Sequence, residues 1–293
     1  MPELPEVETV RRGLERLIIG KKVTHVSHDW PKGFPNTDAD VASFFVGAQI
    51  MAVRRRAKVL LLDLSSDYTL VTHLKMTGQL VWIATPGKKV RERWGAGHPN
   101  ESLVGELPDR STHVIIEFDD GSHLYFNDQR KFGWMKLFPT LEVPEIDFMK
   151  KVGPEPLEDN FTAKEFRVRF TRRKNTWIKA ALLDHTVIAC VGNIYADESL
   201  WGAKIDPRRK VSELTTAEFN TLYRELRYVM NLAIEKGGST DRNYVNAEGK
   251  KGSYMDFARV FRREKLACPR CGHTIEKIKH AGRGTHFCPN CQR

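Results

Sequence analysis

Four cysteines near the C-terminus limit what this chain can fold into more than any other feature of its sequence. Cys268 and Cys271 form one close pair, Cys288 and Cys291 form a second, and sixteen residues separate the pairs. Four thiolates at this spacing match a closed tetrahedral zinc site, with free thiols or disulfides as the alternatives. Because protein would fill every coordination position, one Zn2+ ion bound there would be structural. Residues 275–286 between the pairs predict a hairpin, with residues 281–285 at or near its tip.

The chain's N-terminus predicts a reducing compartment, in which the remaining cysteine needs no partner. Cys190 stands alone between Ala189 and Val191, and we expect it to be a small buried hydrophobe. The N-terminus has no basic segment followed by an apolar stretch, and no apolar run approaches the roughly 20 residues of a membrane span. We therefore expect a cytoplasmic protein without membrane contact, in which paired cysteines are typical of metal binding.

The charge of the chain predicts a polyanionic partner. Its 293 residues carry 47 Lys and Arg against 37 Asp and Glu, a net charge of +10. Nucleic acid and an acidic membrane surface are the two classes that such a balance favours. Residues 259–293 hold nine Lys and Arg against two acids. A basic hairpin fixed by zinc is suited to phosphate contact, and Arg283 between two glycines can approach a backbone closely, although a merely solvated arginine is the alternative.

The first half of the chain predicts strands. Asp120-Gly121 between two apolar runs is a strong hairpin signal. Residues 85–110 are rich in Gly, Pro and alternating charge, and predict a long exposed loop. Lys58 follows three arginines inside an otherwise apolar strand, so its ammonium is expected to face solvent or a polyanion. The runs that read as strands are 21–30, 47–64, 69–74, 78–83, 112–118 and 122–126.

The second half predicts helices. The expected segments are 161–171, 177–183 and 194–201, followed by a helix in which Thr215 and Glu218 form a capping box and Gly237 ends the helix. Residues 237–252 are polar and glycine-rich, which fits either a plain connector or a mobile lid. Length and pattern together predict two domains with separate cores.

The first residues place a potential nucleophile beside two acids. Removal of Met1 would expose Pro2, and an α-amine titrates near ~8 where a lysine titrates near ~10. Such an amine can attack a sugar C1′ or an aldehyde and form a cationic imine. Pro5 and the apolar period predict a helix that brings Glu3 and Glu6 to one side. An ordinary amphipathic helix with acids in its first turn is the alternative.

The opening Pro2-Glu3-Leu4-Pro5-Glu6-Val7-Glu8-Thr9 resembles that of bacterial formamidopyrimidine-DNA glycosylases, a base-excision repair family. Further motifs follow in the family's order over nearly the full chain, namely His73–Gly78, Asn127–Gly133, Gly153–Pro156, Val191–Glu198 and the cysteine module. The resemblance implies an α+β fold with an N-terminal β-sandwich domain and flanking helices over residues 1–138. A linker at 139–158, a helix-two-turn-helix domain at 159–258 with a lesion-capping loop at 237–256, and a zinc-finger β-hairpin at 259–293 would follow.

The same resemblance implies a bifunctional DNA glycosylase and abasic-site lyase that acts on damaged duplex DNA as a monomer at the bacterial nucleoid. Pro2 would displace an oxidised purine through a Schiff base, and β,δ-elimination would cleave the strand. Glu3 would donate a proton to the opening sugar, and Glu6 would organise the terminus. Lys58 and Arg283 would neutralise phosphates and assist the leaving groups.

The implied DNA contacts fall on three motifs. His73, Lys174, Lys179 and Asn193 would lie near phosphates, while Met76, Arg130 and Phe132 would fill the gap left by an extruded nucleotide. From residue type alone, Met76 and Phe132 would more often be core residues, His73 a satisfied polar group and Asn193 a helix cap.

Three departures and two other functions stay open. Residues 85–110 are longer than the family pattern, Ser111 stands where many members have a DNA-contacting histidine, and Asp241 is an acid within the expected lid. An endonuclease VIII-like enzyme for oxidised pyrimidines is one alternative, although Leu4-Pro5 and Arg130-Lys131-Phe132 favour the purine branch. A non-catalytic zinc-bearing DNA-binding protein is the other.

Overall fold

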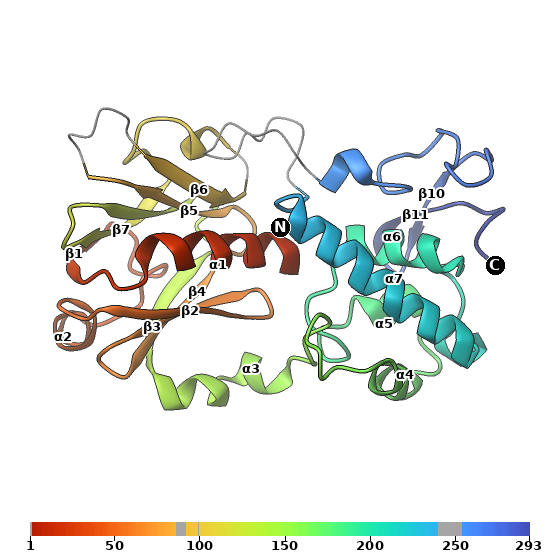
Figure 1. Cartoon of the computed structure of the whole chain (residues 1–293), viewed down its shortest axis with the longest axis horizontal. Helices are drawn as coiled ribbons and strands as arrows, with labels where there is room; N and C mark the ends of the chain where they lie inside the picture. Colours follow the sequence, from red (N-terminus) through yellow and green to blue (C-terminus); the bar gives the residue numbers. More distant parts are fainter. Residues whose placement is uncertain (1, 86–91, 99, 240–253) are drawn as a thin grey trace. The chain divides into compact units, whose positions relative to one another are not determined.

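The computed structural model describes residues 2–85, 92–98, 100–239 and 254–293. The chain forms two compact units, of which the first holds the described residues up to Lys150 and the second those from Lys151 onwards (Figure 1). The finer boundaries at 138 and 158, and a zinc module separate from the helical domain, stay predictions. No helix in the described parts of the chain is both long and apolar enough to cross a membrane.

Two antiparallel sheets build the first unit, with inner faces that share one hydrophobic core. The larger has the order β1-β7-β8-β5-β6, formed by Val23–His28, Thr112–Phe118, His123–Asp128, Gly78–Ile83 and Arg93–Gly97. The smaller has the order β2-β3-β4-β9, formed by Ile50–Arg56, Val59–Leu64, Tyr68–His73 and Trp134–Pro139. The predicted β-sandwich in an α+β chain is confirmed, as is the β7–β8 hairpin at Asp120-Gly121.

The helix α1, Leu4–Ile18, runs along this sandwich and contacts both β2 and β6, the first strand of one sheet and the last of the other (Figure 1). Of its apolar residues at helical spacing, Leu4, Val7, Val10 and Leu14 are buried and Leu17 is partly buried. Gly13 permits a close approach to the larger sheet, since a Cβ there would lie 1.9 Å from a ring carbon of Trp94. The helix that begins beside Pro2 is therefore fixed to the body of the unit.

Two expectations about the strands were wrong. Residues 47–64 form a hairpin rather than a single run, with Ala57 and Lys58 as the two-residue connection between β2 and β3. Residues 85–110 are not a long exposed loop, because β6 pairs with β5 and Leu103 in the 3-10 helix η2, Glu101–Leu103, is buried. Pairing with the sheet edge and burial of apolar side chains outweigh the glycine-rich composition. Residues 86–91 and 99 lie outside the described residues.

The second unit is built from helices near the predicted segments. These are α4, Ala163–Thr171, α5, Ile178–Leu182, α6, Asn193–Ala203, and α7, Thr216–Glu235, while the short α3, Asp147–Lys151, precedes them. The capping box is confirmed, because the Glu218 N–H donates to Thr215 Oγ1 at 3.2 Å. Gly237 follows the helix with a φ of +76°, as expected of its terminator.

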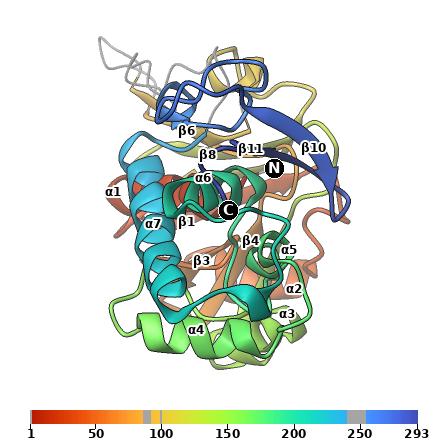
Figure 2. The ribbon, with the colours of Figure 1, turned by 90° about the vertical axis from the view of Figure 1, so that its right-hand side faces the viewer.

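The predicted hairpin is confirmed as β10, Glu276–His280, and β11, Arg283–Phe287. Ala281 and Gly282 form its tip, and both have positive φ angles. Within the second unit, α6 lies between this hairpin and α4 (Figure 2). The predicted lid, with Asp241, falls for the most part on residues 240–253, which lie outside the described residues. Of its C-terminal end, the structure describes the 3-10 helix η5, Tyr254–Phe257.

Candidate functional site

Pro2 is buried, and Glu3 after it is the N-terminal capping residue of α1. The backbone N–H of Glu3 donates to Glu6 Oε2 at 2.7 Å. This bond fixes the direction in which the chain enters the helix, and it fits the predicted role of Glu6 as organiser of the terminus. An amphipathic helix and a cluster of Pro2, Glu3 and Glu6 are thus both present.

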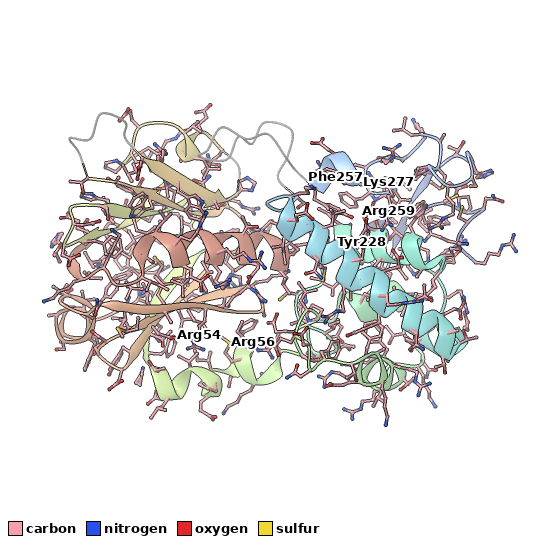
Figure 3. All side chains as sticks on the ribbon, in the orientation of Figure 1. Arg54, Arg56, Tyr228, Phe257, Arg259 and Lys277 are labelled. Carbon is pink, nitrogen blue, oxygen red and sulfur yellow. The ribbon has the colours of Figure 1, made fainter. Side chains whose placement is uncertain are left out.

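Lys58 occupies the β2–β3 turn, which corrects its predicted place inside a strand, and its side chain is only 6% exposed. Ala57 before it has a φ of +55°, which is uncommon for a residue with a Cβ. Arg55 holds this turn, since its Nη1 donates to the Ala57 carbonyl at 2.9 Å. Arg54 and Arg56, the sequence neighbours of Arg55 in β2, are labelled in Figure 3.

An ion pair joins this turn to the helix that follows Pro2. Arg55 Nε lies 3.0 Å from Glu8 Oε2, and Glu8 also accepts from Arg11 and Arg12. Burial alone would raise the pKa of Glu8, but hydrogen bonds from Arg12 and Arg55 hold that pKa below its usual value. A charged Glu8 thus connects α1 with the turn that carries Lys58. No sequence pattern predicts that Glu8 and Arg55 connect α1 with this turn, because an ion pair between distant residues is seen only in the folded chain.

His73 ends β4 opposite Val59, the residue after Lys58. Its Nδ1 accepts the backbone N–H of Lys75 at 3.0 Å. Burial, with further contributions from Lys75 and Lys58, lowers the pKa of His73 to about 3. The ring is therefore neutral at physiological pH, with its proton on Nε2. Such a ring can donate one hydrogen bond to a phosphate oxygen without forming an ion pair, which is compatible with the predicted contact.

The low pKa of His73 gives a stability prediction. The unfolded chain protonates His73 near pH 6.5 and the folded chain near pH 3, so acidification through this window favours unfolding. We expect His73 to lower the unfolding free energy of the first unit by about 2 kcal/mol between pH 6.5 and about pH 5. Urea unfolding of wild type and of His73→Gln across this pH range measures this change in unfolding free energy. The control is His25→Gln, which removes an exposed histidine. If the unfolding free energies of wild type and His73→Gln had equal slopes against pH, the prediction would be contradicted.

Met76, Arg130 and Phe132 project from two loops of the first unit. Met76 lies between β4 and β5, and Arg130 and Phe132 lie between β8 and β9. Met76 is 36% exposed and Phe132 51%, so the alternative that they are core residues is wrong. The Arg130 guanidinium stacks on the Phe132 ring at 4.7 Å. The unit thus presents two apolar side chains and one cation on adjacent loops.

Ser111 is turned inward and takes no part in this surface. It is buried, its Oγ donates to Asp109 Oδ1 at 2.7 Å, and it lies 2.9 Å from Ser102 Oγ. The nearby His113 is buried as well, with its Nδ1 2.8 Å from Asp29 Oδ1. These contacts fasten the start of β7 within the unit.

In the second unit, side chains from α5 and α6 converge on the hairpin residue that follows Arg283. Asn193 Nδ2 and Lys179 Nζ each donate to the Gly284 carbonyl at 3.0 Å. Asn193 is the first residue of α6 and Gly192 its cap, so the helix-cap alternative for Asn193 is wrong. Arg283 and Lys174 are both exposed. The backbone beside Arg283 is therefore fixed while its side chain stays accessible.

Lys179 is only 1% exposed. Its ammonium also donates to Thr285 Oγ1 at 2.7 Å and pairs with Asp197 Oδ1 at 2.6 Å. Burial lowers the pKa of Lys179, against the attraction of Asp197. These contacts join the hairpin to α6, and a direct phosphate contact by Lys179 stays a prediction.

The four cysteines of the tail come together in the second unit. Their sulfur atoms all lie within 4.8 Å of one another, with Cys268 and Cys291 at 3.9 Å and Cys271 and Cys288 at 3.6 Å. Sulfur atoms about 2.3 Å from a tetrahedral Zn2+ ion would be about 3.8 Å apart, so the donor set fits zinc. The site would hold one structural ion, as predicted.

Contacts from α6 fasten this module to the helices. Trp201 Nε1 donates to Cys268 Sγ at 3.4 Å, and the buried Glu198 carboxylate accepts the backbone N–H groups of Arg259, Val260 and Phe261. Arg259 lies between two aromatic rings, 4.7 Å from the Trp201 ring and 5.8 Å from the Tyr228 ring. Figure 3 labels Arg259 and Tyr228 side by side. The basic hairpin is thus held by α6 as well as by its metal ligands.

The chain thus combines a β-sandwich unit, with Pro2 beside two acids, and a helical unit with a basic hairpin and four clustered cysteines. Family models match both: the formamidopyrimidine-DNA glycosylase N-terminal domain at residues 1–135, its H2TH domain at 152–244, and the zinc finger found in FPG and IleRS at 265–293. The chain belongs to the formamidopyrimidine-DNA glycosylase family, which confirms the resemblance and the helix-two-turn-helix domain.

Similar proteins match over the full chain. The formamidopyrimidine-DNA glycosylase of Pediococcus pentosaceus is 43% identical over 100% of this chain and 99% of its own. Lactococcus lactis Fpg in complex with DNA that contains an abasic site is 34% identical, with a TM-score of 0.84 and full coverage of both chains. A variant of that protein with DNA that contains Fapy-dG is 35% identical, with the same TM-score and coverage.

Proposed function

We propose that the chain excises oxidised purines from duplex DNA, with formamidopyrimidines and 8-oxoguanine as substrates, and then cleaves the strand. The observation that carries this proposal is the Glu8–Arg55 ion pair, which joins the helix after Pro2 and Glu3 to the turn of Lys58. It connects the elements that carry a nucleophile, an acid and a cation within the first unit. The relatives of known activity, and the solved complexes with abasic and Fapy-dG DNA, support the substrate class.

Pro2 attacks C1′ of the damaged nucleotide once Met1 has been removed. The new bond forms between its nitrogen and C1′ as the bond from C1′ to the base breaks, and the base leaves with the electron pair and takes up a proton. The nitrogen then gives up its own proton. The bond from C1′ to the ring oxygen breaks as the sugar opens, and Glu3 gives a proton to that oxygen. The product is an iminium between Pro2 and C1′, which carries a positive charge because proline is a secondary amine.

The iminium makes the C2′ proton acidic, and its removal starts strand cleavage. β-Elimination breaks the bond from C3′ to its phosphate oxygen, and δ-elimination then breaks the bond from C5′. Each departing phosphate carries negative charge, which Lys58 and Arg283 neutralise. The DNA backbone on either side of the damaged nucleotide is held in register, so that the reacting sugar meets Pro2. The residues that hold it are His73, Lys174, Lys179 and Asn193.

Extrusion of the damaged nucleotide leaves a gap in the duplex. Met76 and Phe132 fill this gap with apolar surface that replaces lost stacking. Arg130 donates hydrogen bonds to the unpaired cytosine of the other strand. The exposure of these three side chains supports this assignment.

The substrate is chromosomal DNA, so the enzyme works at the nucleoid in the cytoplasm.

Excision assays on defined duplexes test the proposed function. We expect wild type to release 8-oxoguanine opposite cytosine and to leave both ends of the gap phosphorylated. A duplex with thymine glycol at the same position is expected to be processed at least about tenfold more slowly. Faster processing of thymine glycol would assign the chain to the pyrimidine branch. Salt-sensitive binding without cleavage of an abasic duplex would instead indicate a non-catalytic DNA-binding protein.

A further inference from the structure

A buried carboxylate lies at the base of the two loops that carry Met76, Arg130 and Phe132. Asp128 ends β8 and has no exposed surface. Its Oδ2 accepts the backbone N–H groups of Phe132 at 2.8 Å and Gly133 at 2.6 Å, and its Oδ1 accepts that of Arg130 at 3.2 Å. Three backbone donors of one short loop therefore end on a single carboxylate, which fixes the loop's path.

Thr77 extends this arrangement to the second loop. Its hydroxyl donates to Asp128 Oδ1 and accepts the Arg130 N–H at 3.1 Å. Thr77 directly follows Met76, and Gly78 after it pairs with Asp128 in the β5–β8 ladder. One hydroxyl thus connects the loop of Met76 to the loop of Arg130 and Phe132.

Both loops contain a residue that needs such support. Lys75 has a φ of +50° and Lys131 a φ of +54°, in the left-handed region that is unfavourable for a residue with a Cβ. Conformations of this kind persist where surrounding contacts hold them. Gly133 leaves the room that the carboxylate requires, since a Cβ there would lie 3.1 Å from Asp128 Oδ2 and 2.6 Å from the Phe126 ring.

We propose that Asp128 and Thr77 are positioning residues that set the spacing between Met76 on one loop and Arg130 and Phe132 on the other. This inference rests on the proposed function, in which the three side chains enter one gap in the duplex. Side chains from two loops can occupy one gap only if the loops keep a fixed register, and errors of about 1 Å are costly in such sites. The pair therefore controls both nucleotide extrusion and reading of the opposite base.

The direct test replaces the hydroxyl that joins the loops. Thr77→Val removes the bonds to Asp128 and Arg130 at nearly constant volume, whereas Thr77→Ser keeps the hydroxyl. We expect Thr77→Val to slow single-turnover excision of 8-oxoguanine opposite cytosine about tenfold, and to reduce the preference for cytosine over adenine. Thr77→Ser is expected to restore both to within about twofold of wild type. Asp128→Asn, which turns one acceptor into a donor, should have the same effect or a larger one.

A matched control separates positioning from loss of stability. Thr69 is another buried threonine of the first unit. Its hydroxyl donates to Asp63 Oδ1 at 2.8 Å, near the start of β4, whereas the Met76 loop follows the end of that strand. Thr69→Val is expected to lower the melting temperature and to leave the cytosine preference unchanged. Addition of Thr77→Val to a Met76→Ala, Arg130→Ala, Phe132→Ala triple variant should have little further effect, because Thr77 then has none of the three side chains to position.

The outcomes distinguish this inference from the proposed function. A wild type without excision activity would overturn the proposed function and this inference with it. An active wild type whose Thr77→Val variant keeps its rate and cytosine preference would overturn the inference alone. The same conclusion would follow if Thr77→Val slowed excision equally opposite cytosine and adenine, as Thr69→Val would through stability.

Discussion

Replacement of Pro2 by glycine is expected to slow base excision and to reduce borohydride trapping on damaged duplex by about 10²- to 10³-fold. A terminal glycine still has an amine, but a primary amine forms an imine that is neutral until it is protonated. Proline's secondary amine gives an iminium with a permanent charge, and its ring restricts the direction of the nitrogen at the start of α1. Single-turnover excision and the yield of the trapped complex measure the effect.

Pro5→Gly is the matched control for this variant. Pro5 is buried in the first turn of the same helix, so its loss disturbs the local fold and leaves the terminal amine unchanged. We expect Pro5→Gly to lower the melting temperature while trapping stays within severalfold of wild type. Equal trapping by wild type and Pro2→Gly would show that another group is the nucleophile.

Loss of the zinc site is expected to have the second large effect. Cys271→Ala removes one of four sulfur ligands, and structural zinc contributes about 10 kcal/mol or more to the fold of such modules. The hairpin that carries Arg283 should then unfold, and affinity for damaged duplex should fall about 100-fold at moderate salt, because phosphate contacts are lost. Zinc content by elemental analysis and binding at two salt concentrations measure this effect.

Cys190→Ala provides the control for the zinc prediction. Cys190 is buried outside the four-cysteine cluster, so its substitution changes a cysteine of the same unit without touching the metal ligands. It should retain one zinc ion and wild-type affinity. A Cys271→Ala protein that lacks zinc but binds DNA like wild type, with the same salt dependence, would show that the hairpin does not contribute to binding.

Local signals in the sequence were sufficient for much of the fold. The bounds predicted for β5 and β7 are those of the structure, because each strand is a short apolar run between turn residues. The start of α7 followed from a capping box that acts within one helical turn. The four cysteines located their site by spacing alone. In each case the signal itself is local in the chain, even though β7 pairs with the distant β1 and β5 with the distant β8.

The remaining features depend on contacts that no local sequence pattern reveals. The strand β6 contains Gly95 and Gly97 and forms because β5 offers an edge to pair with. The turn at Ala57-Lys58 has neither glycine nor asparagine, and Arg55 and Glu8 support it from outside. The ammonium of the buried Lys179 is held by Asp197 and Thr285, partners that the residue type does not reveal. Such partners become visible only in the folded chain.

Identification of the atom that bonds to the sugar tests the account most directly. Wild type is trapped with borohydride on a duplex that contains 8-oxoguanine, digested, and analysed by peptide mass spectrometry. We expect the reduced sugar on the nitrogen of Pro2, in a peptide from which Met1 is absent. An adduct on Lys58, or full activity in a protein that retains Met1, would contradict the mechanism.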